Sequence, residues 1–458
     1  MTRLPSWTDV ETVAALADRA RGALLRPGDD GYDDARRVWN ARIDREPAAI
    51  LRCRGAADVV AGITAARAEG LDLSVKGGGH HVSGSAIAED GLVLDCGPMD
   101  WVVVDPDARR ARVGPGATWG DVDAETQAHG LAVPGGQDPN IGVAGLTLGG
   151  GVGWLGPTHG CTCDNLRRAQ VASADGRLVT ASADEHPDCF WALRGGGGRV
   201  GVVTEFEFDL HPVGPEITAG SLVYPIDETA AVARYYREFE AAAPPEVRLL
   251  FGSMVLPDSS YYPAAARGAR VAMLMAFHPE PPAVAEPVLA PLRERGEPLM
   301  DSIKGRRYRD WQRAGDSEGS MRTFLRSQYL DDLSDAAIET LVDQAREAPS
   351  AGTTVFCSPR RGAEIEPAVD ATAYPHREHC HHVLVEARWS DPARDDAHVD
   401  WVRSFHDALE PHTTGDAPVN FLTEDELASR REAAFGPNYE RLVAIEEAWD
   451  PDGLFDPA

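Results

Sequence analysis

The sequence has no long apolar segment. Its longest uninterrupted apolar run, residues 271–277, is far shorter than the roughly 20 residues that cross a bilayer. Residues 1–10 also lack the basic stretch followed by an apolar core that a secretory signal requires. We therefore expect a cytoplasmic protein that is not embedded in a membrane.

Positive charge is scarce. The chain has 44 Lys and Arg residues against 73 Asp and Glu residues, a formal charge of -29, and its only lysines are Lys76 and Lys304. Such a surface repels phosphate backbones, so we do not expect a nucleic acid as a partner. The phosphates of an anionic cofactor would have to bind backbone N–H groups. We interpret residues 304–313, which combine cations with aromatics, as the solvated start of a helix.

Several common frameworks are missing as well. The seven cysteines are scattered and odd in number, so we expect no disulfide framework. Cys161 and Cys163 form a C-x-C pair without a second pair at zinc-finger spacing, and we expect no metal there. The dinucleotide fingerprint G-x-G-x-x-G with its following acidic residue is absent, and so is the P-loop motif.

The length of 458 residues predicts two or more lobes. A βα-rich lobe is expected over residues 43–214, with strands near 92–95 and 202–208 and a helix over 58–69 that Gly70 closes. Beyond it, long candidate strands alternate with helical stretches, which is typical of an α+β lobe with an antiparallel sheet. These strands are expected at 247–256, 270–277 and 381–389, and the helices at 228–242, 334–348 and 397–409.

Glycine is concentrated in three clusters of the first lobe, residues 77–84, 135–153 and 195–201. A backbone without side chains lies close to a ligand, and successive exposed N–H groups bind anions such as a pyrophosphate. One such cluster is most simply a tight turn. Three in one lobe favour a cofactor site.

Five ordered motifs in this lobe, at 76–84, 142–154, 162–165, 191–198 and 201–204, match a known family, as do residues 419–421, 438–442 and 450–455 of the tail. The chain resembles the berberine-bridge-enzyme-like flavin oxidoreductases of the vanillyl-alcohol-oxidase and p-cresol-methylhydroxylase (PCMH) superfamily. The resemblance implies an α+β fold, with a two-subdomain PCMH-type FAD-binding lobe and a central antiparallel-sheet substrate domain covered by helices. It implies domains at 1–42 (N-terminal helical part), 43–214 (FAD-binding), 215–415 (substrate) and 416–458 (C-terminal segment returning to the FAD lobe).

The family attaches FAD covalently through the histidine of a G-G-H-x-x-x-G segment, which implies that His80, and not His81, carries the cofactor. A neutral imidazole is a competent nucleophile toward the 8α-methyl group of a flavin. For His81 the simpler interpretation is packing or a hydrogen bond. The resemblance also implies FAD contacts from Lys76, Gly77, Gly78, Gly79, His81, Ser83, Gly84, Pro134, Gly135, Asp138, Gly142, Val143, Gly145, Leu146, Gly149, Gly150, Gly151, Gly153, Arg199, Gly201, Val203, Asn420 and Asn438.

Three positions depart from the family pattern. Asp138 stands where many members have a cysteine that makes a second link, so a single histidyl bond is expected, and Asp138 either acts near the flavin ring or only hydrogen-bonds its loop. Arg199 replaces an asparagine and places a cation near the cofactor. Pro418 replaces a tyrosine that helps to deprotonate the substrate, while Asn420 remains to contact the flavin.

The base that takes the substrate's proton must then come from the second lobe. Our candidates are Tyr374, His376, His382 and Glu386. Alternation along a strand over 381–389 puts His382 and Glu386 on one face, and His381 and Val385 on the other. The simpler alternative is a solvated sheet edge, and a metal site is less favoured because tetrahedral spacing is lacking. Such a site would use His376, His379, Cys380, His381 and His382.

The function implied is FAD-dependent oxidation of a C–H bond in a small organic substrate, such as a secondary metabolite, an alkaloid or a sugar. Hydride transfer to flavin N5 is expected, with O2 as electron acceptor and hydrogen peroxide as product. A dehydrogenase with another acceptor is the nearest alternative, and a flavin-binding module without turnover is a minor one. Substrate identity and oligomeric state are not readable from the sequence.

Overall fold

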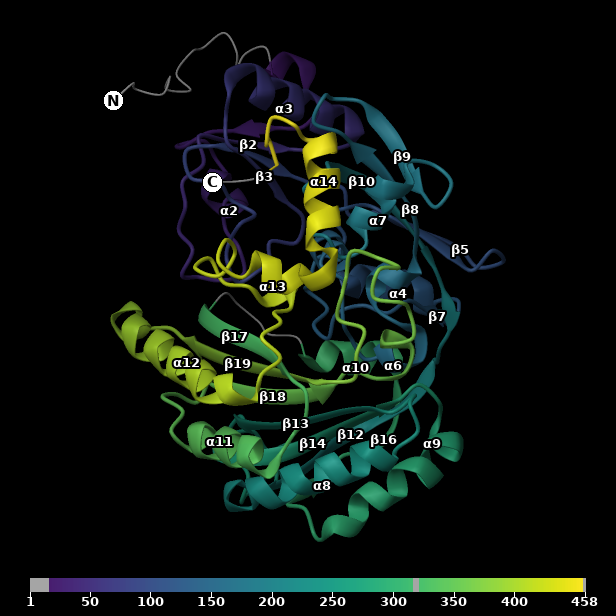
Figure 1. Cartoon of the computed structure of the whole chain (residues 1–458), viewed down its shortest axis with the longest axis vertical. Coiled ribbons are helices and arrows are strands. Elements are labelled where there is room, and N and C mark those ends of the chain that lie inside the picture. Colours follow the sequence, from purple (N-terminus) through teal and green to yellow (C-terminus); the bar gives the residue numbers. More distant parts are fainter. Residues whose placement is uncertain (1–15, 316–320, 456–458) are drawn as a thin grey trace.

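The computed structural model describes residues 16–315 and 321–455. Residues 1–10 lie outside this range, so the expectation that they carry no secretory signal stays a prediction. Within the described range, no helix is both long and apolar enough to cross a membrane. Two lobes are stacked along the long axis of the molecule, and the chain returns to the first lobe at its C-terminal end (Figure 1).

The first lobe contains two sheets. The smaller has the order β1-β2-β4-β3, with β2 and β3 both parallel to β4. Parallel strands are covered on both faces, which explains why β4 is apolar almost throughout. Helix α3 covers it and ends at Gly70 in a left-handed conformation, as expected. The bounds are β1 Leu24–Leu25, α2 Tyr32–Ala35, β2 Ala49–Arg52, α3 Ala56–Glu69, β3 Leu73–Lys76 and β4 Leu92–Asp95.

The larger sheet of this lobe is antiparallel, in the order β5-β6-β10-β8-β9. Its inner face packs Phe206 and Phe208 against Trp119 of α4, all fully buried. The remaining short strands β7 and β11 pair with each other. The bounds are β5 Val102–Asp105, β6 Arg110–Val113, α4 Trp119–Gln127, β7 Leu131–Ala132, α5 Val143–Leu148, α6 Gly156–His159, β8 Leu166–Ala172, β9 Leu178–Ser182, α7 Pro187–Leu193, β10 Val202–Asp209 and β11 His211–Pro212.

The second lobe is one antiparallel sheet, in the order β15-β12-β14-β13-β18-β19-β17, with β16 also paired to β12. The expected long strands and helices are present, so the α+β prediction is confirmed. The strand bounds are β12 Glu216–Pro225, β13 Arg248–Val255, β14 Arg270–His278, β15 Met300–Asp301, β16 Lys304–Arg307, β17 Arg322–Leu330, β18 Thr354–Pro359 and β19 His381–Trp389. The helices are α8 Thr229–Ala242, α9 Pro282–Leu289, α10 Tyr308–Gln312, α11 Asp335–Arg346 and α12 Asp395–Leu409.

The two faces of this sheet differ. Val383, Val385 and Ala387 of β19 join the apolar core beneath α8, α11 and α12. Because strand side chains alternate, His382, Leu384 and other even-numbered residues of β19 point to the opposite face. That face is directed toward the first lobe, whereas α8 and α9 lie at the far end of the molecule (Figure 1). The predicted domain boundaries remain a prediction.

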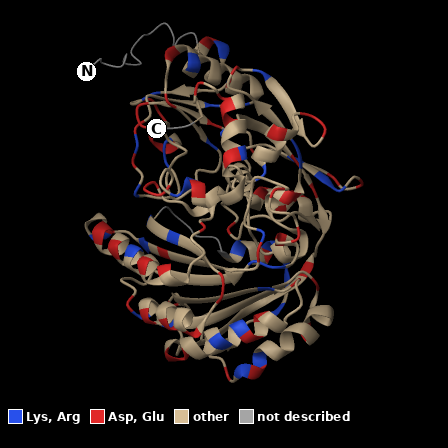
Figure 2. Cartoon of the chain, viewed as in Figure 1, with Lys and Arg blue, Asp and Glu red and all other residues tan. Residues whose placement is uncertain are grey.

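Residues 304–313 correct one expectation. They are not a solvated helix start, because Lys304–Arg307 pairs with β12 and Tyr308, Trp311 and Gln312 are buried in α10. The two aromatic rings pack in one apolar cluster with Trp154 of the first lobe. Charged residues otherwise lie mostly on helices and loops of the second lobe, whose central strands carry few (Figure 2).

A buried carboxylate joins the two lobes beside this cluster. Gln312 of α10 donates one hydrogen bond to Asp123 Oδ2 of α4 (3.0 Å) and another to the Gly136 carbonyl (3.1 Å). Asp123 is only 1% exposed, and burial raises its pKa to about 7. The folded protein therefore binds this proton more tightly than the unfolded chain does.

Asp123→Asn should stabilise the protein above neutral pH. An aspartate in an unfolded chain ionises near pH 4, so folding stability falls as pH rises from about 4 to about 7, by on the order of 2–4 kcal/mol. The variant keeps the hydrogen bond without the charge, and its melting temperature should exceed that of the wild type at pH 8 but not at pH 4.5. Glu125→Gln, on an exposed position of α4, is the control. An equal difference at both pH values would contradict the prediction.

Candidate active site

The glycine clusters meet through backbone contacts. A Cβ atom on Gly78 would lie 2.6 Å from the backbone nitrogen of Gly142, and one on Gly153 would overlap the Gly135 carbonyl. Such distances are shorter than real Cβ contacts, so no other residue fits at these positions. The first and second clusters are therefore pressed together without side chains between them.

The third cluster is joined to the second by one residue, Tyr374. Side chains on Gly150 or Gly195 would both overlap Tyr374, and both glycines have positive φ (101° and 103°). Asn420 fills the corresponding space at Gly149 and donates hydrogen bonds to the carbonyls of Gly149 (3.1 Å) and Leu146 (3.3 Å) at the end of α5. Residues from the second lobe and the tail thus complete the glycine-rich surface.

His80 lies in a small pocket formed by parts distant in sequence. Its imidazole stacks on the Trp39 ring at 4.5 Å, and the Arg388 guanidinium of β19 lies 5.0 Å from the centre of that ring. Nε2 is buried without a hydrogen-bond partner and lies 3.9 Å from Asp138 Oδ2. Burial lowers the His80 pKa, and Asp138 opposes that shift in part. His80 is therefore a neutral imidazole with an unengaged ring nitrogen.

Two neighbours of His80 are engaged by the protein itself. His81 contacts Ser83 Oγ through Nδ1 (2.7 Å) and the Val419 carbonyl through Nε2 (3.3 Å), and burial lowers its pKa. Lys76 Nζ donates to the carbonyls of Ala35 (2.6 Å) and Arg37 (2.8 Å). These side chains hold the first cluster against the tail and the N-terminal loop.

Other residues from the sequence prediction also have structural partners. Asp138 Oδ1 accepts the Asn140 N–H (2.8 Å), so one oxygen supports the loop while the other faces His80. The Asn438 amide donates to the carbonyls of Val369 (2.7 Å) and Thr372 (3.1 Å). The side chains of Val143 and Val203 are packed in the core, so a ligand could reach only their backbone.

Tyr374 and His376 are buried between the lobes. The Tyr374 hydroxyl lies 3.2 Å from that of Tyr329, and Arg360 and Arg377 lie over its ring. Burial raises the Tyr374 pKa well above its ordinary value. The same cause lowers the His376 pKa to about 3, and its Nε2 is buried without a hydrogen-bond partner. Both groups are uncharged.

His382 and Glu386 share one face of β19, as the alternation predicted. The solvated-edge interpretation is wrong, because β19 lies between β18 and β17. His382 Nε2 contacts Ser327 Oγ (2.5 Å), and burial lowers its pKa to about 3. Glu386 is 8% exposed and lies 3.1 Å from the Arg388 guanidinium. Of the four candidate bases only His382 is half-buried, and the other three are buried.

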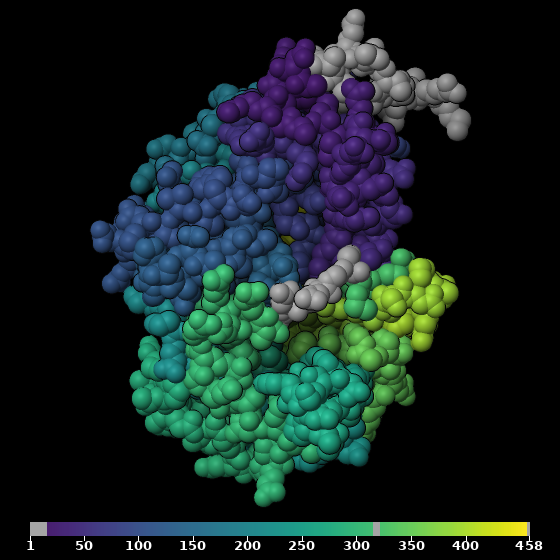
Figure 3. All heavy atoms as spheres, turned by 180° about the vertical axis from the view of Figure 1, so that it is seen from behind, coloured from purple at the N-terminus to yellow at the C-terminus, as the bar shows by residue number. Residues whose placement is uncertain are grey.

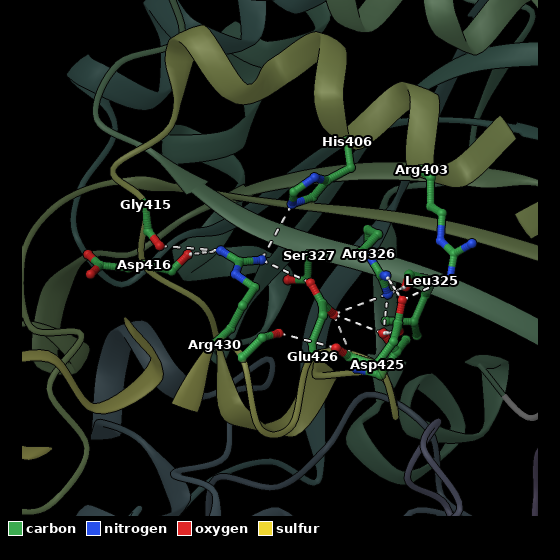
Figure 4. Close-up of polar contacts among 12 residues, drawn as sticks. Leu325, Arg326, Ser327, Arg403, His406, Gly415, Asp416, Asp425, Glu426 and Arg430 are labelled. Atoms are coloured by element: carbon green, nitrogen blue, oxygen red, sulfur yellow. Dashed lines mark hydrogen bonds and ion pairs between the residues drawn. The ribbon is translucent and has the colours of Figure 1, made fainter. Parts of the chain in front are cut away.

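The tail is fastened to the edge strand β17 by a polar clasp, which we define as Arg326, Thr423, Asp425 and Glu426 (Figure 4). Arg326 contacts Asp425 (2.6 Å) and Glu426 (3.2 Å), and Arg403 of α12 contacts Asp425 as well (2.9 Å). Arg326 and Glu426 are nearly inaccessible to solvent. The clasp fixes the chain just after Asn420 and Phe421, and Phe421 lies 5.1 Å from the His382 ring.

Phe421 belongs to the matched tail motif at residues 419–421, although no role was inferred for it, whereas Trp39, Tyr329 and Arg360 were missed. Trp39 lies in a loop with no motif, and Tyr329 lies opposite His382 only because β17 pairs with β19 in that register. Arg360 contacts Cys161 Sγ across the lobe interface (3.2 Å). No local pattern could have found these residues, because each depends on a contact between segments far apart in the sequence.

The residues present fit FAD. A side chain on Gly145 of α5 would meet nothing within 4 Å, whereas one on Gly142 would collide with the Gly78 backbone and one on Gly149 with Asn420. The backbone of α5 at Gly145 therefore has open space beside it. His80 contributes an unengaged nitrogen. A hollow opens between the purple and blue first lobe and the green second lobe, with C-terminal atoms visible inside it (Figure 3).

Comparisons with known proteins agree with this geometry. Residues 47–182 match the FAD binding domain family, and residues 417–457 match the family described as berberine and berberine like. The chain is 29% identical to (R)-6-hydroxynicotine oxidase of Paenarthrobacter nicotinovorans, over 95% of each chain.

Solved structures give the same result. A crystal structure of 6-hydroxy-D-nicotine oxidase from Arthrobacter nicotinovorans matches with a TM-score of 0.83 and 27% identity, covering 95% of this chain and 96% of that one. BBE-like 1 of Physcomitrella patens has the same fold, with a TM-score of 0.86 at 21% identity over 97% of each chain. The chain thus combines an FAD binding domain with a berberine-like C-terminal segment, and over nearly its whole length it is similar to FAD-linked oxidoreductases.

Proposed function

We propose that this enzyme carries FAD on His80 through a single covalent bond and oxidises a C–H bond of a small organic molecule, with O2 as the electron acceptor. The observation that carries the proposal is the neutral, unengaged His80 nitrogen in a pocket beside the glycine clusters. When bound, FAD supplies the acceptor for the two electrons released from the substrate.

The residues around His80 support the attachment. Trp39 fixes the plane of the imidazole, so a ring nitrogen is held in one direction. Bond formation at His80 Nε2 would leave the imidazole positively charged, and Asp138, whose Oδ2 lies 3.9 Å from Nε2, would stabilise that charge. Overall, the attachment would replace one N–H and one C–H bond by the new C–N bond, with O2 taking up the two hydrogens as hydrogen peroxide. Asp138 cannot form a second link to the flavin as a cysteine would, because it has no thiol.

His382 is the proton acceptor in this proposal. It is half-buried on the sheet face directed toward the first lobe, and it is uncharged. The Ser327 hydroxyl can accept the Nε2–H of His382, which leaves the lone pair on Nδ1 for a substrate proton. Tyr329 and Phe421 flank the ring and limit the access of water.

His80→Ala should abolish covalent attachment, whereas His81→Ala should retain it, because His81 already makes two protein contacts. Each purified protein is precipitated with acid, and the flavin absorbance of pellet and supernatant is measured. The wild-type pellet should keep its yellow colour. Release of all wild-type flavin into the supernatant would refute the covalent proposal, and a colourless purified protein would refute the flavin proposal altogether.

His382→Gln should slow flavin reduction by roughly 100-fold without loss of attached flavin, since a positioned base contributes about that much. Anaerobic stopped flow with any compound that bleaches the wild-type flavin measures the rate. Because the His382 pKa is about 3, the base stays unprotonated, and the wild-type rate should not fall between pH 8 and pH 5. His376→Gln is the matched control, and an equal loss in both variants would contradict the assignment.

The electron acceptor is tested by the peroxide yield. An oxidase should release one hydrogen peroxide per substrate oxidised when the reduced enzyme meets air-saturated buffer, measured with a peroxidase-coupled dye. Re-oxidation only by an added artificial acceptor would instead identify the enzyme as a dehydrogenase.

A further inference from the structure

We infer that the substrate of the oxidation proposed above is an uncharged, mainly apolar alcohol, and neither a sugar nor an ion. The inference rests on that proposed function and deepens it. Its basis is the face of the second-lobe sheet that points away from the helices and toward the first lobe. Substrate atoms that reach this face contact the side chains that its strands direct toward the first lobe.

Strand pairing places apolar side chains side by side in the middle of this face. Leu384 of β19 lies opposite Phe356 of β18, and Phe356 lies opposite Gly252 of β13. A Cβ atom on Gly252 would lie 2.5 Å from the Phe356 ring, so the ring occupies the space above the glycine. Met273 of β14 follows in register beyond Gly252.

These apolar side chains are partly open. Phe356 and Leu384 have intermediate exposure, although their neighbours along each strand are buried against the helices. Among the described residues, neither Phe356 nor Leu384 belongs to one of the apolar cores. The two side chains form an apolar floor that the protein covers only in part. An apolar ligand that covers this floor removes apolar surface from water, which favours binding.

Polar groups on the same face are uncharged or already paired. Glu386 and Arg388 form an ion pair at 3.1 Å, and Arg388 also lies over the Trp39 ring. His382 is neutral, and next to it are the hydroxyls of Tyr329 and Ser358 in register. The apolar floor therefore lies between two polar parts of the face, with neutral His382 on one side of Leu384 and the Glu386–Arg388 ion pair on the other.

This arrangement discriminates between ligand classes. A charged ligand would be desolvated over the floor without an unpaired counter-charge, which is costly. A sugar would bring many hydroxyls over Phe356 and Leu384, where they would lose hydrogen bonds to water without replacement. An apolar molecule with one hydroxyl can rest on the floor and direct that hydroxyl to His382. Its oxidation removes the C–H and O–H hydrogens, forms a carbonyl, and reduces O2 to hydrogen peroxide.

The test uses four ligands of two-ring size: 4-biphenylmethanol, biphenyl-4-carboxylate, 4-biphenylmethylammonium and cellobiose. Anaerobic equilibrium dialysis with each ligand in excess over the purified holoenzyme measures their dissociation constants and needs no flavin signal, since without O2 each enzyme molecule oxidises at most one alcohol. The alcohol should bind at least about 10-fold more tightly than each of the other three, since one unpaired buried polar group costs about that factor or more.

Substitutions in the apolar floor test whether the alcohol binds there. Phe356→Asn and Leu384→Asn should each weaken binding of 4-biphenylmethanol by about 10-fold. Leu178→Asn is the matched control, because Leu178 is a 44% exposed strand residue of the first lobe, and it should have no effect. The flavin content of every variant is measured by acid precipitation.

Equal or tighter binding of cellobiose or of either ion would overturn the inference, and so would failure of 4-biphenylmethanol to bind up to its solubility limit. Unchanged binding in both floor variants would overturn it as well. Loss of attached flavin from the wild type would refute the proposed function, whereas weak alcohol binding to a flavin-loaded enzyme would refute only the substrate class.

Discussion

Backbone-to-backbone contact between the glycine loops is the constraint on which the other features depend. Gly78 lies against Gly142 and Gly153 against Gly135, with no room for a Cβ atom. The Gly78–Gly142 contact aligns loops more than fifty residues apart, whereas the Gly135–Gly153 contact closes the second cluster on itself, and both leave the backbone without covering side chains. Tyr374 and Asn420 occupy the remaining space at Gly150 and Gly149. A cofactor site built this way needs no basic side chains, which suits a chain with a formal charge of -29.

Buried ionic contacts hold the second lobe on this scaffold. Arg248 of β13 donates to the Gly153 carbonyl (2.9 Å) and pairs with Glu364, and both side chains are fully buried. Arg377, which is also buried, pairs with the partly exposed Asp164 of the first lobe (2.6 Å). Replacing one partner of such a pair leaves the other charge buried and unpaired, so these contacts determine the relative position of the lobes strictly. The sheet face that bears His382 is thereby kept over the glycine loops.

Features that depend on interactions between residues close in the sequence could be predicted, and features that depend on contacts between distant segments could not. Helix α3 with its Gly70 cap, and strands such as β4 and β19, depend on neighbours within a few residues, and their bounds agree with the sequence within about two residues. The family resemblance rested on loops in which backbone contact leaves room only for glycine. The pocket of His80 was not foreseen, because Trp39, Asp138 and Arg388 come together only through tertiary packing. The 304–313 stretch was misassigned for the same reason: its aromatic rings are buried against Trp154 of the other lobe.

The same distinction explains why the cofactor was easier to deduce than the substrate. FAD phosphates need backbone N–H groups in a fixed arrangement, and only glycine-rich sequences provide them, so the requirement is visible in the sequence. A substrate surface is formed by alternate residues of separate strands, and any apolar residue serves there. Phe356 and Leu384 look like ordinary core residues until the register β18–β19 and the position of the helices are known. Their partial exposure, opposite a fully covered face, is what distinguishes a binding floor from a core. The strand register therefore determines which side chains contact the substrate, and these side chains can be identified only from the folded sheet.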